Sequence, residues 1–141
     1  MKNILIALIV GLSLTSTALA KQKSGEVSGH VKWGSNLTDD EMKIEESAVL
    51  YIFAKKTGDG PGRPMAVKKV EQPFKFPLEF TLSEKDVMVP DIPFEGPMHV
   101  TARISQSGSA MPVESGDIEG STKKPVKVGT KDIEIELDTI K

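Results

Sequence analysis

Cysteine is absent from this sequence of 141 residues, which contains one tryptophan and one tyrosine. Without cysteine the protein has neither a disulfide bond nor a thiolate nucleophile, so an apolar core must supply its stability. A strong charge of either sign is also lacking, because 18 Lys and Arg residues stand against 20 Asp and Glu residues. The formal charge of −2 gives no electrostatic basis for binding nucleic acid or an anionic membrane.

Long apolar runs are scarce too, and the longest lies at the N-terminus, at residues 4–14. Lys2 precedes this run, and the small-x-small sequence Ala18–Ala20 follows it. The run is about half as long as a membrane-spanning helix. We therefore predict that residues 1–20 are a secretory signal peptide rather than an uncleaved anchor. No cysteine follows the cleavage site, which excludes a diacylated lipoprotein. We expect residues 21–141 to be one bacterial domain, periplasmic or secreted, without a membrane span after signal cleavage.

Most of the remaining chain alternates apolar and polar residues with a period of two, the pattern of half-buried β-strands. A continuous apolar run at 48–54 is instead typical of a central strand covered on both faces. Strands are predicted at 26–33, 48–54, 65–70, 74–82, 98–105, 125–128 and 132–137. A short polar segment after the turn at 107–108, ending at 116–117 before Gly120, is predicted to be the partner of 98–105.

Glycine and proline punctuate these strands at intervals of about ten residues, and no helical pattern follows the signal peptide. The longest such connections are 55–64 and 89–97. Seven to eight short strands in this arrangement predict an all-β fold, an immunoglobulin-like Greek-key β-sandwich. A small β-barrel is the alternative architecture.

Enzyme chemistry finds little support in the sequence. No Gly-x-Ser-x-Gly elbow occurs, and paired carboxylates such as Glu134 and Glu136 fall on solvated strand faces or in loops. The glycine-rich loop at 58–62 lacks the Lys-Ser/Thr pair of a phosphate-binding loop. We therefore predict a protein that is not an enzyme and needs no cofactor.

A metal site is the main alternative, since His30, His99 and Met111 supply imidazole and thioether groups. Soft sulfur favours reduced copper, so a periplasmic copper or haem carrier is a second hypothesis. Met98 adjoins His99, but neighbouring residues on a strand point to opposite faces and cannot share one ion without a bulge. Structural or surface histidines are the simpler interpretation.

Arg103 is a long cation in the middle of a predicted strand, where it needs a partner. We favour an ion pair with Asp117 or Glu119 on the returning segment, because exposed strand cations commonly pair across a sheet. The other interpretation is recognition of a peptide carboxylate. The candidate binding residues are accordingly Arg103, Ser105 and Asp117.

Several segments together resemble one known domain. The most specific is ARIS-x-SG-x-A followed by GD, from Ala102 to Asp117. The others are 27–31 (VSGHV), 50–54 (LYIFA), 60–68 (GPGRPMAVK) and 80–82 leading to 86–88. In order and spacing they resemble the C-terminal immunoglobulin-like domain of the cytochrome c-type biogenesis protein CycH, also called CcmI.

The resemblance implies a periplasmic β-sandwich that takes part in cytochrome c maturation, where CycH captures apocytochrome and delivers it for haem ligation. The matching segments include neither the membrane helices nor the tetratricopeptide-repeat domain of CycH-like proteins. We expect a non-enzymatic binding or adaptor module whose partner is a protein or peptide of the cytochrome c maturation machinery. An edge strand, or the loops 55–64 and 89–97 at one end of the sandwich, would engage an extended peptide.

Overall fold

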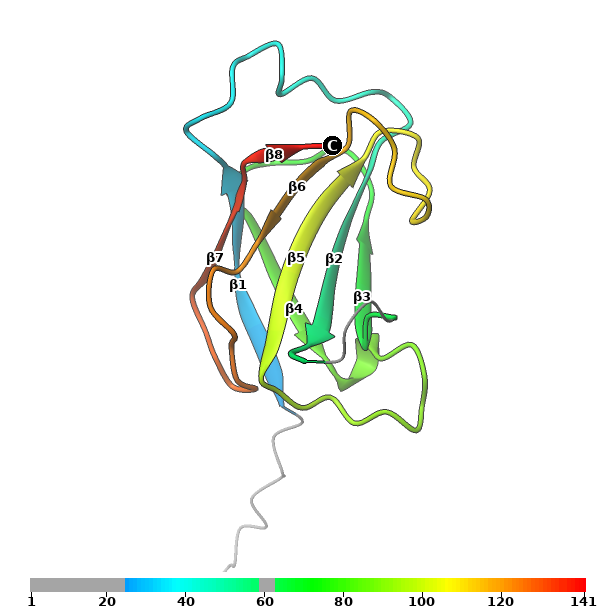
Figure 1. Cartoon of the computed structure of the whole chain (residues 1–141), viewed down its shortest axis with the longest axis vertical. Coiled ribbons are helices and arrows are strands. Elements are labelled where there is room, and N and C mark those ends of the chain that lie inside the picture. Colours follow the sequence, from blue (N-terminus) through cyan, green and yellow to red (C-terminus); the bar gives the residue numbers. More distant parts are fainter. Residues whose placement is uncertain (1–24, 59–62) are drawn as a thin grey trace, which may run out of the picture.

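The computed structural model describes residues 25–58 and 63–141, so the predicted signal peptide at 1–20 lies outside the described residues. Within these ranges no helix is long and apolar enough to cross a bilayer. The elements shown in Figure 1 are β1 (Glu26–Trp33), β2 (Val49–Lys56), β3 (Ala66–Val70), β4 (Leu78–Ser83), the 3-10 turn η1 (Glu84–Asp86), β5 (Met98–Ser105), β6 (Ile118–Ser121), β7 (Ile133–Leu137) and β8 (Thr139–Ile140).

The strands form two sheets, one of three strands in the order β4-β1-β7 and one of five in the order β3-β2-β5-β6-β8. In the smaller sheet β1 pairs antiparallel with β4 and parallel with β7. The larger sheet is antiparallel throughout, with β2 and β5 at its centre. The predicted immunoglobulin-like sandwich is therefore confirmed, and the strands do not close into a single barrel.

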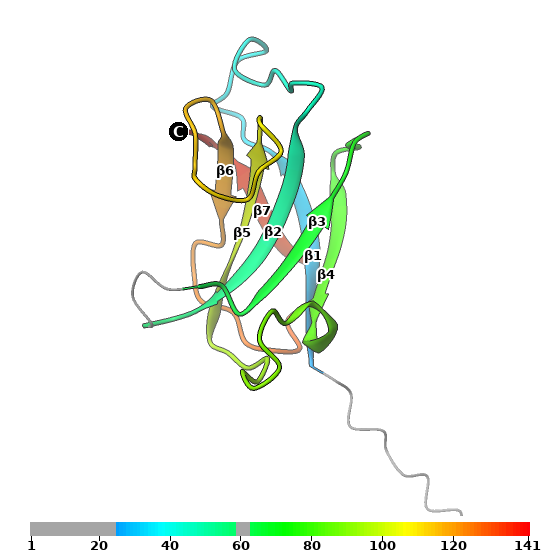
Figure 2. The ribbon, with the colours of Figure 1, turned by 90° about the vertical axis from the view of Figure 1, so that its right-hand side faces the viewer.

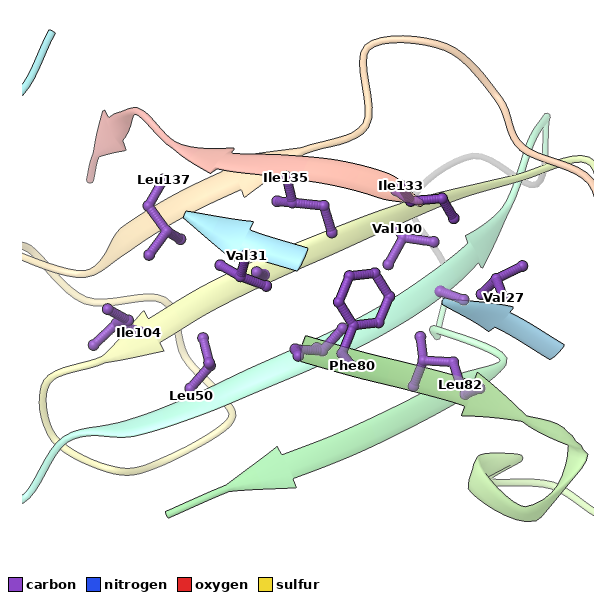
Figure 3. Packing of buried hydrophobic residues seen from close by; sticks show 14 of the residues in the cluster. Val27, Val31, Leu50, Phe80, Leu82, Val100, Ile104, Ile133, Ile135 and Leu137 are labelled. Carbon is purple, nitrogen blue, oxygen red and sulfur yellow. The ribbon is translucent and has the colours of Figure 1, made fainter. Parts of the chain in front are cut away.

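The core lies between the two sheets and follows from the alternation in the sequence. Val31 and Ile135 of the smaller sheet face Leu50 and Ile104 of the larger one (Figure 3). Fully burying an aliphatic side chain of this size is worth about 1.5–3 kcal/mol, so the core is the main stabilising term in a protein without disulfides. Eleven of its members are Val27, Val31, Leu50, Ile52, Phe80, Leu82, Val100, Ile104, Ile133, Ile135 and Leu137.

Two strand predictions need correction. The segment 74–82 enters the sheet only at Leu78, because Pro77 has no N–H to donate to a ladder. Phe74 and Phe76 come before the strand and are half-buried, with the Phe76 ring 5.0 Å from that of Trp33. These rings close one end of the sandwich rather than lining its centre.

The predicted strand at 125–128 is wrong. Val126 makes a single isolated bridge to Met98, and the rest of the segment is connection. The last strand was missed instead, because β8 has only two residues, both exposed, and shows no alternation. It carries the chain from the smaller sheet to the edge of the larger one.

Gly120 of β6 lies directly against the backbone of β7. A Cβ atom added to Gly120 would lie 1.7 Å from the carbonyl oxygen of Glu136. Asp138 N–H donates to Glu119 O at 3.1 Å just beyond this point, where the chain crosses between the sheets. The crossing therefore depends on a residue without a side chain.

Replacing Gly120 with alanine is expected to lower the free energy of unfolding by about 2 kcal/mol or more, because the new methyl group must displace backbone. Gly129 is the matched control, since it has φ +94° and no atom within 4 Å of an added Cβ. Gly129→Ala should cost about 1 kcal/mol, from backbone strain alone. Urea denaturation followed by Trp33 fluorescence measures both, and equal losses would contradict the close approach at Gly120.

Candidate functional site

The candidate binding residues lie in and beneath the connection between β5 and β6, residues 106–117, which we call the strap. Figure 2 shows this yellow-to-gold segment folding back beside the ends of β5 and β6. Alternation along β5 places Ala102 and Ile104 in the core and turns Arg103 and Ser105 to the outer face of the sheet. Arg103 is nevertheless only 6% exposed and Ser105 fully buried, because the strap covers them.

Three side chains from β2 and β5 hold the strap against the sheet by donating to three successive carbonyl oxygens. Side-chain bonds to main-chain acceptors fix the path of a segment that belongs to neither sheet. Tyr51 Oη donates to Gly108 O at 2.7 Å, Ser105 Oγ donates to Ser109 O at 2.7 Å, and Arg103 Nη2 donates to Ala110 O.

The strap turns sharply at Gly108, which has φ +87°. This conformation favours glycine, and a Cβ atom there would also lie 2.6 Å from Ser47 O. The glycine of the Ser107-Gly108 pair, in the motif that begins at Ala102, thus has a steric explanation. It lets the strap fold back onto Tyr51 and Ser105.

Asp117 closes the base of the strap from a fully buried position. Its Oδ1 accepts the Gln106 N–H and its Oδ2 accepts the Glu114 N–H, each at 2.9 Å. Because both carboxylate oxygens accept backbone N–H groups, the two ends of the strap are tied to one side chain. Hydrogen bonds to a charged group are about twice as strong as neutral ones.

Gln106 joins the strap to the long loop between β1 and β2. Its Nε2 donates to Lys43 O at 2.9 Å and its Oε1 accepts the Glu45 N–H at 2.9 Å. Sequence analysis did not single out Gln106, since a lone glutamine after a strand has no distinctive pattern. Tyr51 was missed for the opposite reason, because it sits in an apolar run that suggested core packing alone.

The predicted ion pair of Arg103 with Asp117 or Glu119 does not form. Both Asp117 oxygens are occupied by backbone N–H groups. Glu119 lies opposite Arg103 in the β5–β6 register, but its carboxylate is 3.5 Å from Lys141 Nζ instead. The Arg103 guanidinium lies 5.6 Å from the Phe53 ring centroid, and its Nε has no hydrogen-bond partner in the described part of the chain.

The structure does not bring the three candidate metal ligands together. His30 lies on the smaller sheet, 3.5 Å from Glu79, whereas His99 lies on the larger sheet with Nδ1 3.3 Å from Thr122 Oγ1. Met111 is 74% exposed on the strap, beyond the opposite end of β5 from His99. Across residues 25–58 and 63–141 no group of three or more His, Cys, Asp or Glu side chains could hold an ion.

The face around His30 carries a row of paired charges, as predicted for the carboxylates of β7. Lys32 Nζ lies 3.3 Å from Glu134 and 3.6 Å from Glu136. The hydrogen bond and charge of Glu134, and then those of Glu136, raise the pKa of Lys32. Exposed pairs of this kind add little to stability, so the row is a solvated surface.

The other end of the sandwich exposes apolar side chains on the proline-rich connection between η1 and β5. Met88 is 56% exposed and Ile92 42%. Thr57 N–H donates to Pro97 O at 3.0 Å, so the predicted loops 55–64 and 89–97 do meet at this end, although 59–62 lie outside the described residues. An open depression here is lined by Glu84, Val87, Pro90, Asp91, Ile92 and Pro93.

This fold is that of a small immunoglobulin-like domain, and comparison with known sequences makes the assignment specific. Residues 30–138 match the cytochrome c-type biogenesis protein H Ig-like domain, so the chain belongs to that family. The resemblance inferred from the segments quoted above is therefore confirmed. Its most specific motif, 102–117, corresponds to the end of β5 and the strap.

Two relatives cover different shares of the chain. An uncharacterized protein of Aquifex aeolicus is 30% identical over 123 residues, which are 86% of this chain and 76% of that protein. The cytochrome c-type biogenesis protein CycH of Pseudomonas aeruginosa is 32% identical over 79 residues, 55% of this chain. The match spans only 18% of that CycH protein.

Among solved structures, an alternative pilotin from the type II secretion system of Vibrio cholerae is similar over 79% of this chain and 94% of its own. The TM-score is 0.47 and the sequence identity 17%. A similarity at this level carries no argument about function.

Asp117→Ala is expected to lower the free energy of unfolding by about 3 kcal/mol, because two buried backbone N–H groups lose a charged acceptor. Asp117→Asn should cost less, since the amide keeps one acceptor oxygen. Asp91→Ala, at an exposed position, is the control and should change stability by less than about 0.5 kcal/mol. Urea denaturation measures the free energy of unfolding of all three variants. If Asp117→Ala lowers it no more than the control does, Asp117 does not hold the ends of the strap together.

Proposed function

We propose that this protein is a non-enzymatic binding module of cytochrome c maturation in the bacterial periplasm, where it holds apocytochrome or a protein of the assembly machinery. The observation that carries the proposal is the family match across residues 30–138, which covers nearly all of the described sandwich. The predicted signal peptide, residues 1–20, supports the periplasmic placement. The relative named CycH shares only part of its length with this chain, so its whole activity is not transferred.

The partner surface we propose is the end of the sandwich formed by the proline-rich connection. Exposed Met88 and Ile92 supply apolar contacts there, and Glu84 and Asp91 line the same depression. A peptide with an apolar side chain next to a basic one would match this surface in both shape and charge. Proline fixes the backbone of the connection in advance and so lowers the entropy lost on binding.

Arg103, Ser105 and Asp117 each hydrogen-bond to backbone groups of the strap or its base. These contacts favour a role in shaping the domain over a role in chemistry. We assign no catalytic step to them.

Affinity capture tests the proposed function. Tagged residues 21–141, added to a periplasmic extract, should recover apocytochrome c or proteins of cytochrome c assembly, and added apocytochrome should change the set recovered. The control bait is an unrelated periplasmic β-sandwich that carries the same tag. Recovery of the same proteins by both baits, or of none from cytochrome c assembly, would exclude the proposal.

A matched pair of variants tests the surface. Ile92 and Val113 are both 42% exposed, at opposite ends of the sandwich. Ile92→Asp should reduce the recovered partner by about tenfold, because it places a charge in an apolar contact. Val113→Asp should leave capture unchanged, and the reverse result would move the surface to the strap.

A further inference from the structure

Arg103 is a buried cation without a counter-charge. It is 6% exposed, and no carboxylate in the described residues lies within 4 Å of its guanidinium. Its partners are the Ala110 carbonyl oxygen and the face of the Phe53 ring. Arginine does not deprotonate in proteins, so the full positive charge stays in this position.

Buried charges are ordinarily paired, because removing an ion from water is costly unless an opposite charge and hydrogen bonds compensate. Here the compensation is incomplete, since Nε has no hydrogen-bond partner among residues 25–58 and 63–141. Nε and the adjacent terminal nitrogen form the fork of donors that a carboxylate matches with two parallel bonds. Nε–H is therefore the donor that a carboxylate would need in addition to Nη2.

The charged side chains on the sheet surface around Arg103 are paired with one another. On the outer surface of the sheet, Lys69 is registered opposite Tyr51 and Lys55 opposite His99. The one carboxylate that the register places beside Arg103 is Glu119, which is already paired with Lys141. Lys69 is likewise paired, with its Nζ 3.6 Å from Glu71, so the surface charges registered nearest Arg103 are balanced and leave its own charge uncompensated.

Asp117 fixes the ends of the strap, and its middle covers Arg103. The strap is held on its outer side by single hydrogen bonds from Tyr51, Ser105 and Arg103, not by a strand ladder. Glycines with φ above +80° lie near both of its ends, at Gly108 and Gly116. The middle of the strap takes no part in the ladders that pair β5 with β2 and β6, so its opening would leave them intact.

We propose that Arg103 is a carboxylate-binding site closed by the strap. A carboxylate displaces the Ala110 carbonyl and accepts from both Nε and the neighbouring terminal nitrogen, over the Phe53 ring. The carboxylate belongs to a peptide, either at its C-terminus or on a Glu or Asp side chain. This site is distinct from the proline-rich end of the sandwich and does not depend on the identity of the partner there.

The direct test observes the Nε–H group itself. In ¹⁵N-labelled protein (residues 21–141), the Arg103 Nε–H resonance is followed while N-acetylglycine is added, and N-acetylglycinamide is added in a parallel series at equal ionic strength. The two probes differ only in the carboxylate. We expect a saturable shift with N-acetylglycine alone. No shift with either, or equal shifts with both, would overturn the proposal and leave Nε bonded to a buried water.

Variants separate a binding role from a structural one. Arg103→Lys keeps the charge but removes the fork, so binding should weaken by about tenfold. Tyr51→Phe removes one bond of the strap, so the open state becomes easier to reach and N-acetylglycine should bind several-fold more tightly. Lys32→Gln, in the exposed charged row of the smaller sheet, is the control and should alter affinity by less than about threefold. Weaker binding in Tyr51→Phe would show that the strap does not act as the cover.

The source of the carboxylate is decided by two blocked dipeptides, N-acetyl-Ala-Ala with a free C-terminus and N-acetyl-Ala-Glu amide. Binding of either supports the site, and the one that binds more tightly identifies its source. Affinity capture by the proline-rich end can fail while this titration succeeds, or the reverse, so the two proposals stand or fall separately.

Discussion

The structure depends on how β5 satisfies its polar outer face. This strand lies at the centre of the larger sheet, so its inner side chains join the core while Arg103 and Ser105 lie on the other side. Buried polar groups need hydrogen-bond partners, and neighbouring strands cannot supply enough of them. The strap supplies successive carbonyl oxygens, and Asp117 in turn supplies acceptors for its ends. One requirement for hydrogen bonds thus connects the sheet, the strap and the loop held by Gln106.

The same need for hydrogen-bond partners explains several residues of the motif at 102–117, the part of the sequence that most specifically resembles CycH. Ser105 and Asp117 bond to backbone, and Gly108 makes the turn that brings the strap within reach. Arg103 departs from this pattern, because its charge is buried and one of its donors is unused. Among the described residues, Arg103 Nε is the one buried side-chain nitrogen or oxygen without a hydrogen-bond partner, and it is the atom that the proposed carboxylate would engage.

The sandwich also separates two surfaces with different chemistry. The proline-rich end presents apolar side chains with acidic neighbours, around Ile92 and Asp91. The strap, at the opposite end of β5, covers a cation and exposes Met111. Membership of the cytochrome c-type biogenesis protein H Ig-like family accounts for the scaffold that carries both. Fold membership alone does not specify which surface meets a partner, because function depends on particular side chains placed on a shared architecture.

The sequence by itself determined most of the strands, their inward faces and the sandwich, because strand alternation is a local property that burial enforces. Val31, Ile104 and Ile135 lie at apolar positions of the strands predicted at 26–33, 98–105 and 132–137, and all three are buried in the core. Only the tertiary structure decided which polar groups meet. Arg103 and Asp117 are close in sequence yet do not pair, because the folded strap brings backbone N–H groups to the carboxylate first. The strand expected near Val126 did not form, and His30, His99 and Met111 lie apart, for a related reason: ladder partners and ligand groups come from distant segments, and no local pattern encodes which sheet each segment joins.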